Sequence, residues 1–121
     1  MAGNLYKDLV VWQLSVNLIK DVYTIAESLP KTEEYILKQQ LKRAVISVAL
    51  NIAEGKNRRT AKDFANFLNM SVASLSEVDA ILMICEELHY LQELDSIHSD
   101  IEKLGKMINA LRTKLLARKS A

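Results

Sequence analysis

The feature that most constrains this chain is its shortage of residues that form turns. Its 121 residues include only three glycines and one proline. A sandwich or barrel of β-strands needs a turn about every 8–12 residues, whereas long helices need few turns. The sequence therefore predicts an all-α protein, and its length is that of a single domain over residues 1–121.

Apolar residues recur at alternating steps of four and three along four segments of the chain. This spacing is typical of helices that pack side by side at a shallow angle. Short connections between long helices force neighbouring helices to run antiparallel. We therefore expect an antiparallel up-down-up-down four-helix bundle, with helices that include residues 5–26, 37–52, 64–85 and 97–115.

Residues typical of helix ends separate these segments. Pro30 is expected to end the first helix, because the residue before a proline avoids the α conformation. Thr32 and Thr60 are expected to cap the second and third helices with their hydroxyl groups. Gly55 is placed as the C-cap of the second helix. The fourth helix is expected to begin at Asp95 or at the serine after it.

The predicted core stripe includes Trp12 and Ile19 on the first helix and runs from Phe64 to Cys85 on the third. Each of these helices carries a second apolar stripe beside it. One explanation is a wide core face, since bundle helices often bury about three positions in seven. The other is contact between copies of the chain, because contiguous exposed apolar area usually marks an interface. We expect self-association. The additional residues are Val11, Leu18, Val22, Ile25 and Leu29 on the first helix and Phe67, Met70, Ile81, Ile84 and Leu88 on the third.

A net charge of +1 conceals a segregation of charged residues along the chain. Residues 36–62 sum to +6, and residues 103–121 also sum to +6, whereas residues 63–102 contain nine acids and no Lys or Arg. Local fields of both signs therefore exist on a nearly neutral protein and influence what binds to it. The alternative is that acidic and basic helices simply pair within the fold.

Residues that could carry out catalysis or bind a metal are sparse. Glu86 and His89 have the spacing of ferritin-like di-iron ligands, and Asp95 and His98 repeat it. That site also requires inward-facing Glu residues from the other two helices, which their core stripes lack. Both histidines are therefore expected to be polar surface groups near the turn between the third and fourth helices. The single cysteine, Cys85, lies on a core stripe and is expected to act as a small apolar residue. We expect no enzyme activity, cofactor or metal.

The sequence also bears on location. No apolar run approaches the length of about 18 residues that a membrane-spanning helix needs, and no signal peptide is recognisable at the N-terminus. One cysteine cannot form an intrachain disulfide. We therefore expect a protein that neither crosses nor binds a membrane and that lies in the cytoplasm.

A carboxylate near the end of the second helix conflicts with the helix dipole. Glu54 stands on the last turn, where a negative charge is unfavourable. A basic partner is expected, and Arg43, Arg58 and Arg59 are the candidates. We expect a buried polar pair between helices.

The third helix is interrupted by polar residues on its apolar side. Ser71, Ser74 and Glu77 are the residues concerned. Serine allows two helices to approach closely, and its hydroxyl can hydrogen-bond across the interface. We expect these residues to specify how the helices pair.

Several motifs along the chain occur together in a known family. They include Leu9-x-x-Trp12-Gln13, Leu29-Pro30-x-x-Glu33 and the string Asn51-Ile-Ala-Glu-Gly55. With them, the chain resembles the bacterial 23S rRNA intervening-sequence protein family, whose members are described as four-helix bundle proteins. The resemblance covers residues 5–115. The signature residues, which we expect to be structural, are Trp12, Pro30, Arg43, Ser47, Asn51, Glu54, Gly55, Ser74 and Glu77.

The resemblance implies an assembly more than an activity. Genes of the family lie within some bacterial 23S rRNA genes and elsewhere in chromosomes, so the family name describes a genomic location. The related accessory proteins of diversity-generating retroelements form pentameric barrels with a basic surface, and they bind nucleic acid and a reverse transcriptase. By this resemblance we expect a homopentamer.

Two functions follow from the charge pattern and the resemblance. The first is a non-enzymatic scaffold that binds RNA or DNA through basic segments repeated around a ring. The second is an adaptor that docks a protein partner through its acidic segment, residues 63–102, or through a ring end. The residues expected to contact phosphate groups in the scaffold are Lys38, Lys42, Arg43, Lys56, Arg58, Arg59 and Lys62.

Overall fold

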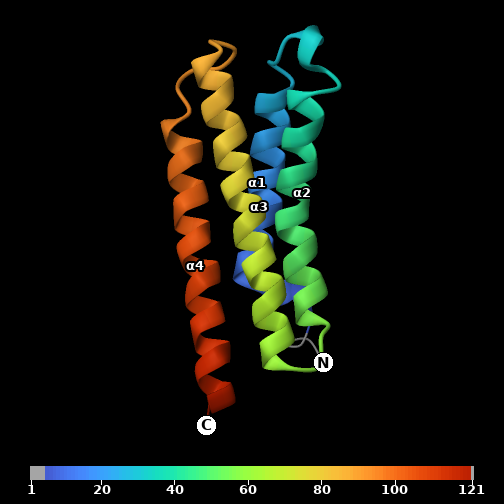
Figure 1. The fold of residues 1–121 in the computed structure, drawn as a ribbon, viewed down its shortest axis with the longest axis vertical. Helices are drawn as coiled ribbons and strands as arrows, with labels where there is room; N and C mark the ends of the chain where they lie inside the picture. Colours follow the sequence, from blue (N-terminus) through green and yellow to red (C-terminus); the bar gives the residue numbers. More distant parts are fainter. Residues whose placement is uncertain (1–4, 121) are drawn as a thin grey trace.

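The protein is a bundle of four long helices packed side by side (Figure 1). The structure is a computed structural model that describes residues 5–120, with side chains to residue 117. Within that part of the chain there is no strand, so the predicted all-α class is confirmed. The helices are α1 (Val10–Ala26), α2 (Leu37–Lys56), α3 (Ala61–Glu87) and α4 (Asp95–Ser120), with single turns of 3-10 helix at η2 (Tyr6–Asp8) and η3 (Lys31–Glu33).

Consecutive helices run antiparallel, as expected for short connections. Among the four interfaces between neighbouring helices, α2–α3 is the most extensive, followed by α3–α4, α1–α2 and α1–α4. The α2–α3 turn and the C-terminal end of α4 lie at one end of the bundle, and the α3–α4 turn lies at the other (Figure 1).

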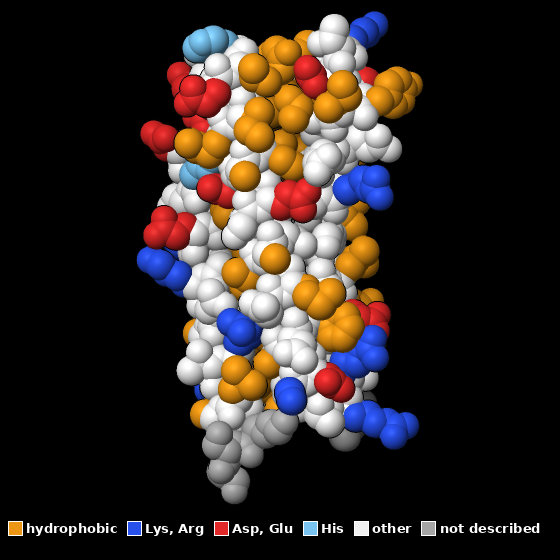
Figure 2. All heavy atoms as spheres, in the orientation of Figure 1, with side chains coloured by type: hydrophobic (Ala, Val, Ile, Leu, Met, Phe, Trp, Pro, Cys, Tyr) orange, Lys and Arg blue, Asp and Glu red, His pale blue; other side chains and the backbone are white. Residues whose placement is uncertain are grey.

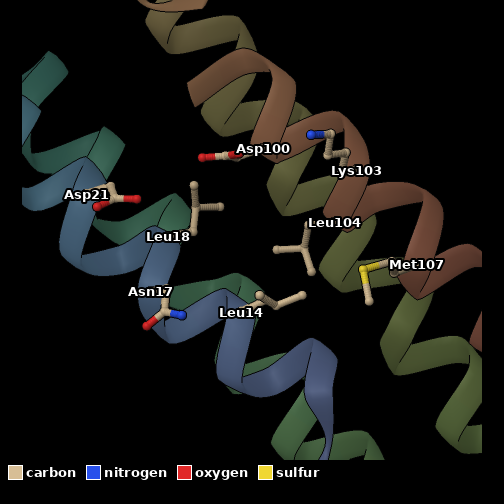
Figure 3. Close-up of a pocket in the computed structure, with 8 residues that line it drawn as sticks. All are labelled: Leu14, Asn17, Leu18, Asp21, Asp100, Lys103, Leu104 and Met107. Atoms are coloured by element: carbon tan, nitrogen blue, oxygen red, sulfur yellow. The ribbon is translucent and has the colours of Figure 1, made fainter. Parts of the chain in front are cut away.

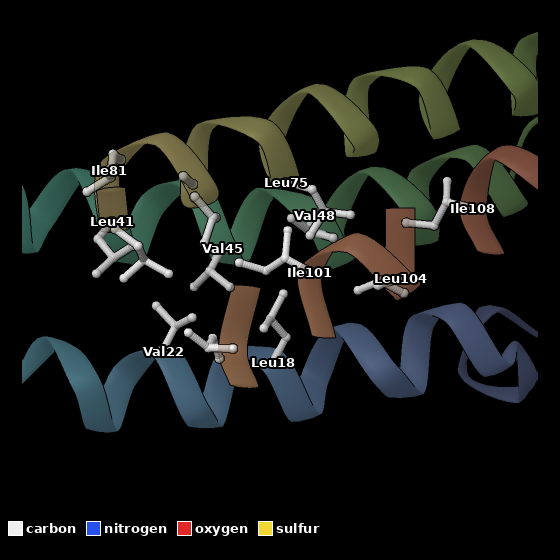
Figure 4. Packing of buried hydrophobic residues seen from close by; sticks show 14 of the residues in the cluster. Leu18, Val22, Leu41, Val45, Val48, Leu75, Ile81, Ile101, Leu104 and Ile108 are labelled. Carbon is white, nitrogen blue, oxygen red and sulfur yellow. The ribbon is translucent and has the colours of Figure 1, made fainter. Parts of the chain in front are cut away.

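The core is formed by apolar stripes from all four helices (Figure 4). On α3 the predicted core stripe from Phe64 to Cys85 is buried. Burial raises the pKa of the Cys85 thiol, helped by the charge of Glu33, so this cysteine acts as the expected apolar residue.

On α1 the predicted core stripe is wrong. The structure buries the neighbouring stripe, which includes Val11, Leu18 and Val22, and leaves Trp12 and Ile19 half-buried at its edge. Periodicity finds both stripes, but packing against α2 and α4 decides which of them turns inward. The additional apolar residues of α1 therefore widen the core rather than form an outer surface.

Of the three predicted helix starts, two agree with the structure and one does not. The hydroxyl oxygen of Thr60 accepts a hydrogen bond of 3.1 Å from the backbone N–H of Asp63, so it caps α3. The fourth helix begins at Asp95 as expected. Thr32 instead lies within η3, and α2 begins only at Leu37, without a side-chain cap.

Gly55 is not the C-cap that the sequence suggested. Helix α2 continues through it to Lys56, and its φ angle is not positive. A Cβ atom on Gly55 would lie 2.8 Å from the Cβ of Phe67 and 2.9 Å from Cδ1 of Phe64, both on α3. A glycine is therefore required here by the close approach of two helices, not by a turn.

The C-terminus of α3 uses a residue with positive φ that is not glycine. His89 has φ of 63°. Its N–H donates to the carbonyl of Glu86, and the N–H of Tyr90 donates to the carbonyl of Cys85. These two bonds form a Schellman motif, in which glycine is the preferred residue at the position of His89.

Helix α3 is long and apolar enough to cross a membrane, with a mean hydropathy of 1.4 over its most apolar window. One such helix is weak support for a membrane span, because the core helix of a soluble bundle passes the same test. Here α3 packs against both α2 and α4. The expected absence of a membrane span stays a prediction.

Candidate nucleic-acid interface

Basic residues from two distant parts of the chain meet at one end of the bundle. The α2–α3 turn and the last turns of α4 both lie there because α3 and α4 are antiparallel (Figure 1). Arg112 of α4 joins the two regions, since its Nε lies 3.4 Å from the carbonyl oxygen of Ala65 on α3. Lys and Arg side chains gather toward this end of the face shown in Figure 2. The basic end is formed by Lys56, Arg58, Arg59, Lys62, Arg112 and Lys114.

Two cations of the turn are held against the protein. The guanidinium carbon of Arg58 lies 4.6 Å from the ring centre of Phe67, and its Nη2 lies 2.9 Å from Oε2 of Glu54. The Nζ of Lys56 lies 5.9 Å from the ring centre of Phe64. These contacts keep both side chains close to the surface of the helices.

Three further cations of the basic end have no ion-pair partner among the described side chains. Arg59, Lys62 and Lys114 are exposed, and no carboxylate within residues 5–117 forms an ion pair with them. Arg118 and Lys119 follow on the same helix, but their side chains lie outside the described part of the chain. Free cations exchange solvent counterions for phosphate at little structural cost.

Arg58, one of the three predicted partners, does pair with Glu54, but the pair is not buried between helices as predicted. Arg58 pairs with Glu54 one turn away, and both side chains are about half exposed. The pair therefore neutralises a carboxylate at the end of α2, as the dipole requires. It does not form the buried link between helices that we expected.

Three of the predicted contact residues lie elsewhere, two of them, Lys38 and Lys42, near the beginning of α2. Lys38 stands in the first turn of α2, about 27 Å along the helix from Lys56. Lys38 binds Glu27 at 3.3 Å and Glu34 at 3.1 Å, and Lys42 binds Glu27 at 3.0 Å. Hydrogen bonds from Lys42 and Lys38 lower the pKa of Glu27. These ion pairs link the α1–α2 connection to the first turns of α2. Lys38 and Lys42 therefore do not lie at the basic end.

Arg43 lies on the outer side of α2, away from both groups of lysines. It is exposed and lines a shallow groove of about 470 Å³ together with Gln40, Ser47 and Glu77. Within the described residues it forms no ion pair. The predicted contact residues therefore separate into the basic end, the α1–α2 connection and this single arginine.

Signature residues of α2 and α3 line the seam between these two helices. The hydroxyl groups of Ser47 and Ser74 lie 2.9 Å apart, and the amide of Asn51 donates to Ser47 at 3.0 Å. Gln40 donates to Glu77 at 3.0 Å across the same seam. These contacts place the polar residues of the third helix at its interface with α2. That they specify how the helices pair stays a prediction.

Three other residues support this picture of structural roles. Ser71, which is fully buried, donates a 2.8 Å hydrogen bond to the carbonyl of Val48 across the α2–α3 seam. Trp12 packs edge-on to Tyr6 with ring centres 5.1 Å apart. Pro30 precedes η3 in extended conformation, as its fixed φ allows.

The opposite end of the bundle is acidic and contains a histidine that sequence reasoning misplaced. We expected both histidines to be surface groups, and His89 is exposed. His98 is instead held between α3 carboxylates, with Nδ1 2.5 Å from Asp79 and Nε2 2.8 Å from Glu86. Partial burial opposes the charged ring, but the hydrogen bonds to Asp79 and Glu86 outweigh it and raise the pKa of His98.

A seven-residue spacing could have revealed these partners. Asp79 and Glu86 are one heptad apart, so they lie on one face of α3, and His98 follows the turn on the antiparallel helix. The Glu86–His89 and Asp95–His98 pairs of the di-iron pattern are not formed. Across residues 5–117, no group of His, Cys, Asp and Glu is arranged to hold a metal ion.

Comparisons with known proteins agree with this architecture. A solved structure of a protein with unknown function from the S23 ribosomal protein family of Bacteroides thetaiotaomicron is similar, with a TM-score of 0.78 and 22% identity. The likeness covers 85% of this chain and 98% of that one, and it shows the fold. Curated proteins give no match. The model of the 23S rRNA-intervening sequence protein family matches residues 7–110, and the chain therefore belongs to this family.

Proposed function

We propose that the protein is a non-enzymatic scaffold that binds RNA or DNA through its basic end. The observation that carries the proposal is the meeting of the α2–α3 turn with the last turns of α4. Arg59, Lys62 and Lys114 are exposed there without an ion pair among the described side chains. Such cations bind phosphate largely without regard to sequence. The proposal places the protein in the cytoplasm and requires no cofactor.

Self-association would multiply this positive charge, and we propose a ring of identical copies, with a pentamer preferred. The outer face of α2 and α3 supports self-association because it leaves large apolar residues in water. Leu50 is 62% exposed and Met70 49% exposed on the two facing helices. Contiguous apolar surface of this kind usually marks an interface. Repeating one basic end per copy would raise the effective affinity for a long polyanion.

Salt-dependent binding of a fluorescent duplex DNA and a structured RNA tests the scaffold. We expect log affinity to fall linearly with log salt, with a slope of about −0.9 for each phosphate contacted on duplex DNA. Combining Arg59→Glu with Lys62→Glu should lower affinity about tenfold or more and reduce the slope by about two. The matched control is Lys20→Glu with Lys31→Glu, which reverses two exposed lysines away from the basic end.

If the two double variants lost affinity for nucleic acid equally, binding would not be specific to the basic end. Absence of binding by the unmodified protein at low salt would overturn the scaffold altogether. A protein adaptor would then be the better candidate, because Glu87, Glu93 and Asp95 at the opposite end are exposed and lack ion pairs within residues 5–117.

Native mass spectrometry at micromolar concentration tests the ring. We expect an oligomer that Leu50→Lys and Met70→Lys each dissociate. Met83→Lys is the matched control, since Met83 is 48% exposed on α3 but lines a hollow on the α3–α4 side of that helix. A monomeric unmodified protein would contradict the ring.

A further inference from the structure

The seam between α1 and α4 is open along part of its length. Figure 3 shows side chains of the two helices facing each other across a hollow of about 320 Å³. Its floor is apolar, formed by Leu14 and Leu18 of α1 and by Leu104 and Met107 of α4. Leu14 is 37% exposed and Met107 40% exposed, so this floor is open to solvent.

The hollow continues toward the α3–α4 turn. A second hollow of about 530 Å³ shares Asp21 and Asp100 with the first and extends to Ile25 and Glu93. From Leu14 to Ile25 the groove follows α1 for about 16 Å, or three helical turns. A groove of this length, with an apolar floor, has the dimensions of a helix-binding site.

The rim of this groove is acidic and not neutralised. Asp21 and Asp100 line the same hollow from opposite helices, and Glu93 stands further along. None of the three forms an ion pair among the side chains described. Lys103 is the one cation lining the first hollow. Like charges facing each other across an apolar floor favour a cationic occupant over an anionic one.

We propose that the α1–α4 groove docks a basic amphipathic helix of a partner protein. Two apolar side chains of that helix, three or four residues apart, would fill the space between Leu14 and Met107. A Lys or Arg on the next turn would reach Asp21 and Asp100. A second copy of this chain fits less well, because its exposed α2–α3 face combines the carboxylates of Glu54 and Glu77 with a single cation, Arg43, and is therefore not basic. The proposal does not depend on the basic end.

Fluorescence anisotropy with a labelled model peptide tests the proposal. The probe is an amphipathic helix of about 14 residues made of Leu and Lys, long enough to cover about three turns of groove. Its twin replaces every Lys by Glu, and a scrambled Leu/Lys peptide of equal charge lacks an apolar face. We expect the Leu/Lys helix to bind about tenfold or more tightly than either comparison peptide.

Two pairs of substitutions locate the binding. Asp21→Lys with Asp100→Lys should weaken the Leu/Lys peptide about tenfold and strengthen its Leu/Glu twin. Leu14→Asn with Met107→Asn removes the exposed part of the floor and should also weaken the Leu/Lys peptide about tenfold. The matched control is Asp8→Lys with Glu87→Lys, which makes the same charge change at exposed sites outside the groove. Thermal unfolding of each variant establishes that it folds.

Several results would overturn the proposal. Equal binding of the scrambled peptide, or equal loss in the Asp8/Glu87 control, would reduce the effect to nonspecific surface charge. Cross-links from Lys103 to a second copy, in an oligomer that the Asp21/Asp100 variant dissociates, would show that another copy occupies the groove. DNA affinity is measured in parallel. It should be unchanged or slightly higher in the groove variants, so failure here is distinguishable from failure of the scaffold.

Discussion

The α2–α3 and α1–α4 seams use similar apolar spacing but reach different packing. At α2–α3, Gly55 brings the helix backbone against Phe67, and Ser47, Ser71 and Ser74 form hydrogen bonds along the contact. At α1–α4, larger side chains such as Met107 meet across an open groove. The distance between packed helices depends on the side chains at the contact. A seam therefore closes only where small residues allow it and polar groups find partners.

The largest difference between tight and open regions is expected from truncating a buried leucine in each. Leu68 on α3 is fully buried, whereas Leu104 forms the floor of the α1–α4 groove. Leu68→Ala should lower the free energy of unfolding by about 3–5 kcal/mol and Leu104→Ala by about 2–3 kcal/mol, because the groove can collapse around the smaller side chain. Urea denaturation measures both. Equal losses would mean that the groove floor is as rigid as the core.

A pair of glycine substitutions sharpens the same contrast. Gly55→Ala should destabilise the protein by about 1–3 kcal/mol, because the new methyl group would overlap Phe64 and Phe67. Gly105→Ala meets only Leu75 at 3.9 Å and should stabilise α4 by about 0.5–1 kcal/mol. Melting temperatures of the two variants should therefore move in opposite directions. A neutral Gly55→Ala variant would contradict the close approach.

The cluster of His98, Asp79 and Glu86 predicts that the stability of the protein depends on pH. It lies at the α3–α4 seam, whose extent is intermediate between those of the α2–α3 and α1–α4 seams. The pKa of His98 is raised in the folded state, so its stabilising effect is complete below the unfolded pKa and is lost as pH rises through the folded pKa. Stability should thus fall as the solution is made alkaline from the unfolded pKa of about 6.5.

Urea denaturation across that pH range, with His98→Gln as the comparison, measures the contribution. The variant should lose about 1–2 kcal/mol at pH 6 and show a smaller dependence on pH, because the charge-assisted bonds to Asp79 and Glu86 are gone. Parallel pH curves for the two proteins would exclude His98 as the titrating group.

The smallest effect is expected at the end of α3, where neither seam is altered. His89→Gly removes the cost of a positive φ and should stabilise the protein by up to about 1 kcal/mol. His89→Ala keeps a side chain at the same φ and should give no such gain. Differential scanning calorimetry compares the two variants, and a larger gain from alanine would mean that backbone strain is not the cause.

Part of the candidate site could be predicted from local sequence. Arg58, Arg59 and Lys62 are neighbours in a turn, so their common location needs no tertiary information. Lys38 and Lys42 belong to the same basic segment, but they lie at the other end of a 20-residue helix, where Glu27, which follows α1, and Glu34, which follows η3, bind them. Charge summed along a chain does not distinguish the two ends of one helix.

The sequence by itself determined the four helices, their antiparallel order and the inward stripe of α3, because these follow from residue spacing and short turns. Only the tertiary structure decided which stripe of α1 faces inward, why position 55 must be glycine and which carboxylates hold His98. It also decided that α1 and α4 leave a groove. Periodicity is a property of each helix alone, whereas rotation, spacing and ion pairing depend on residues that meet only after the helices pack.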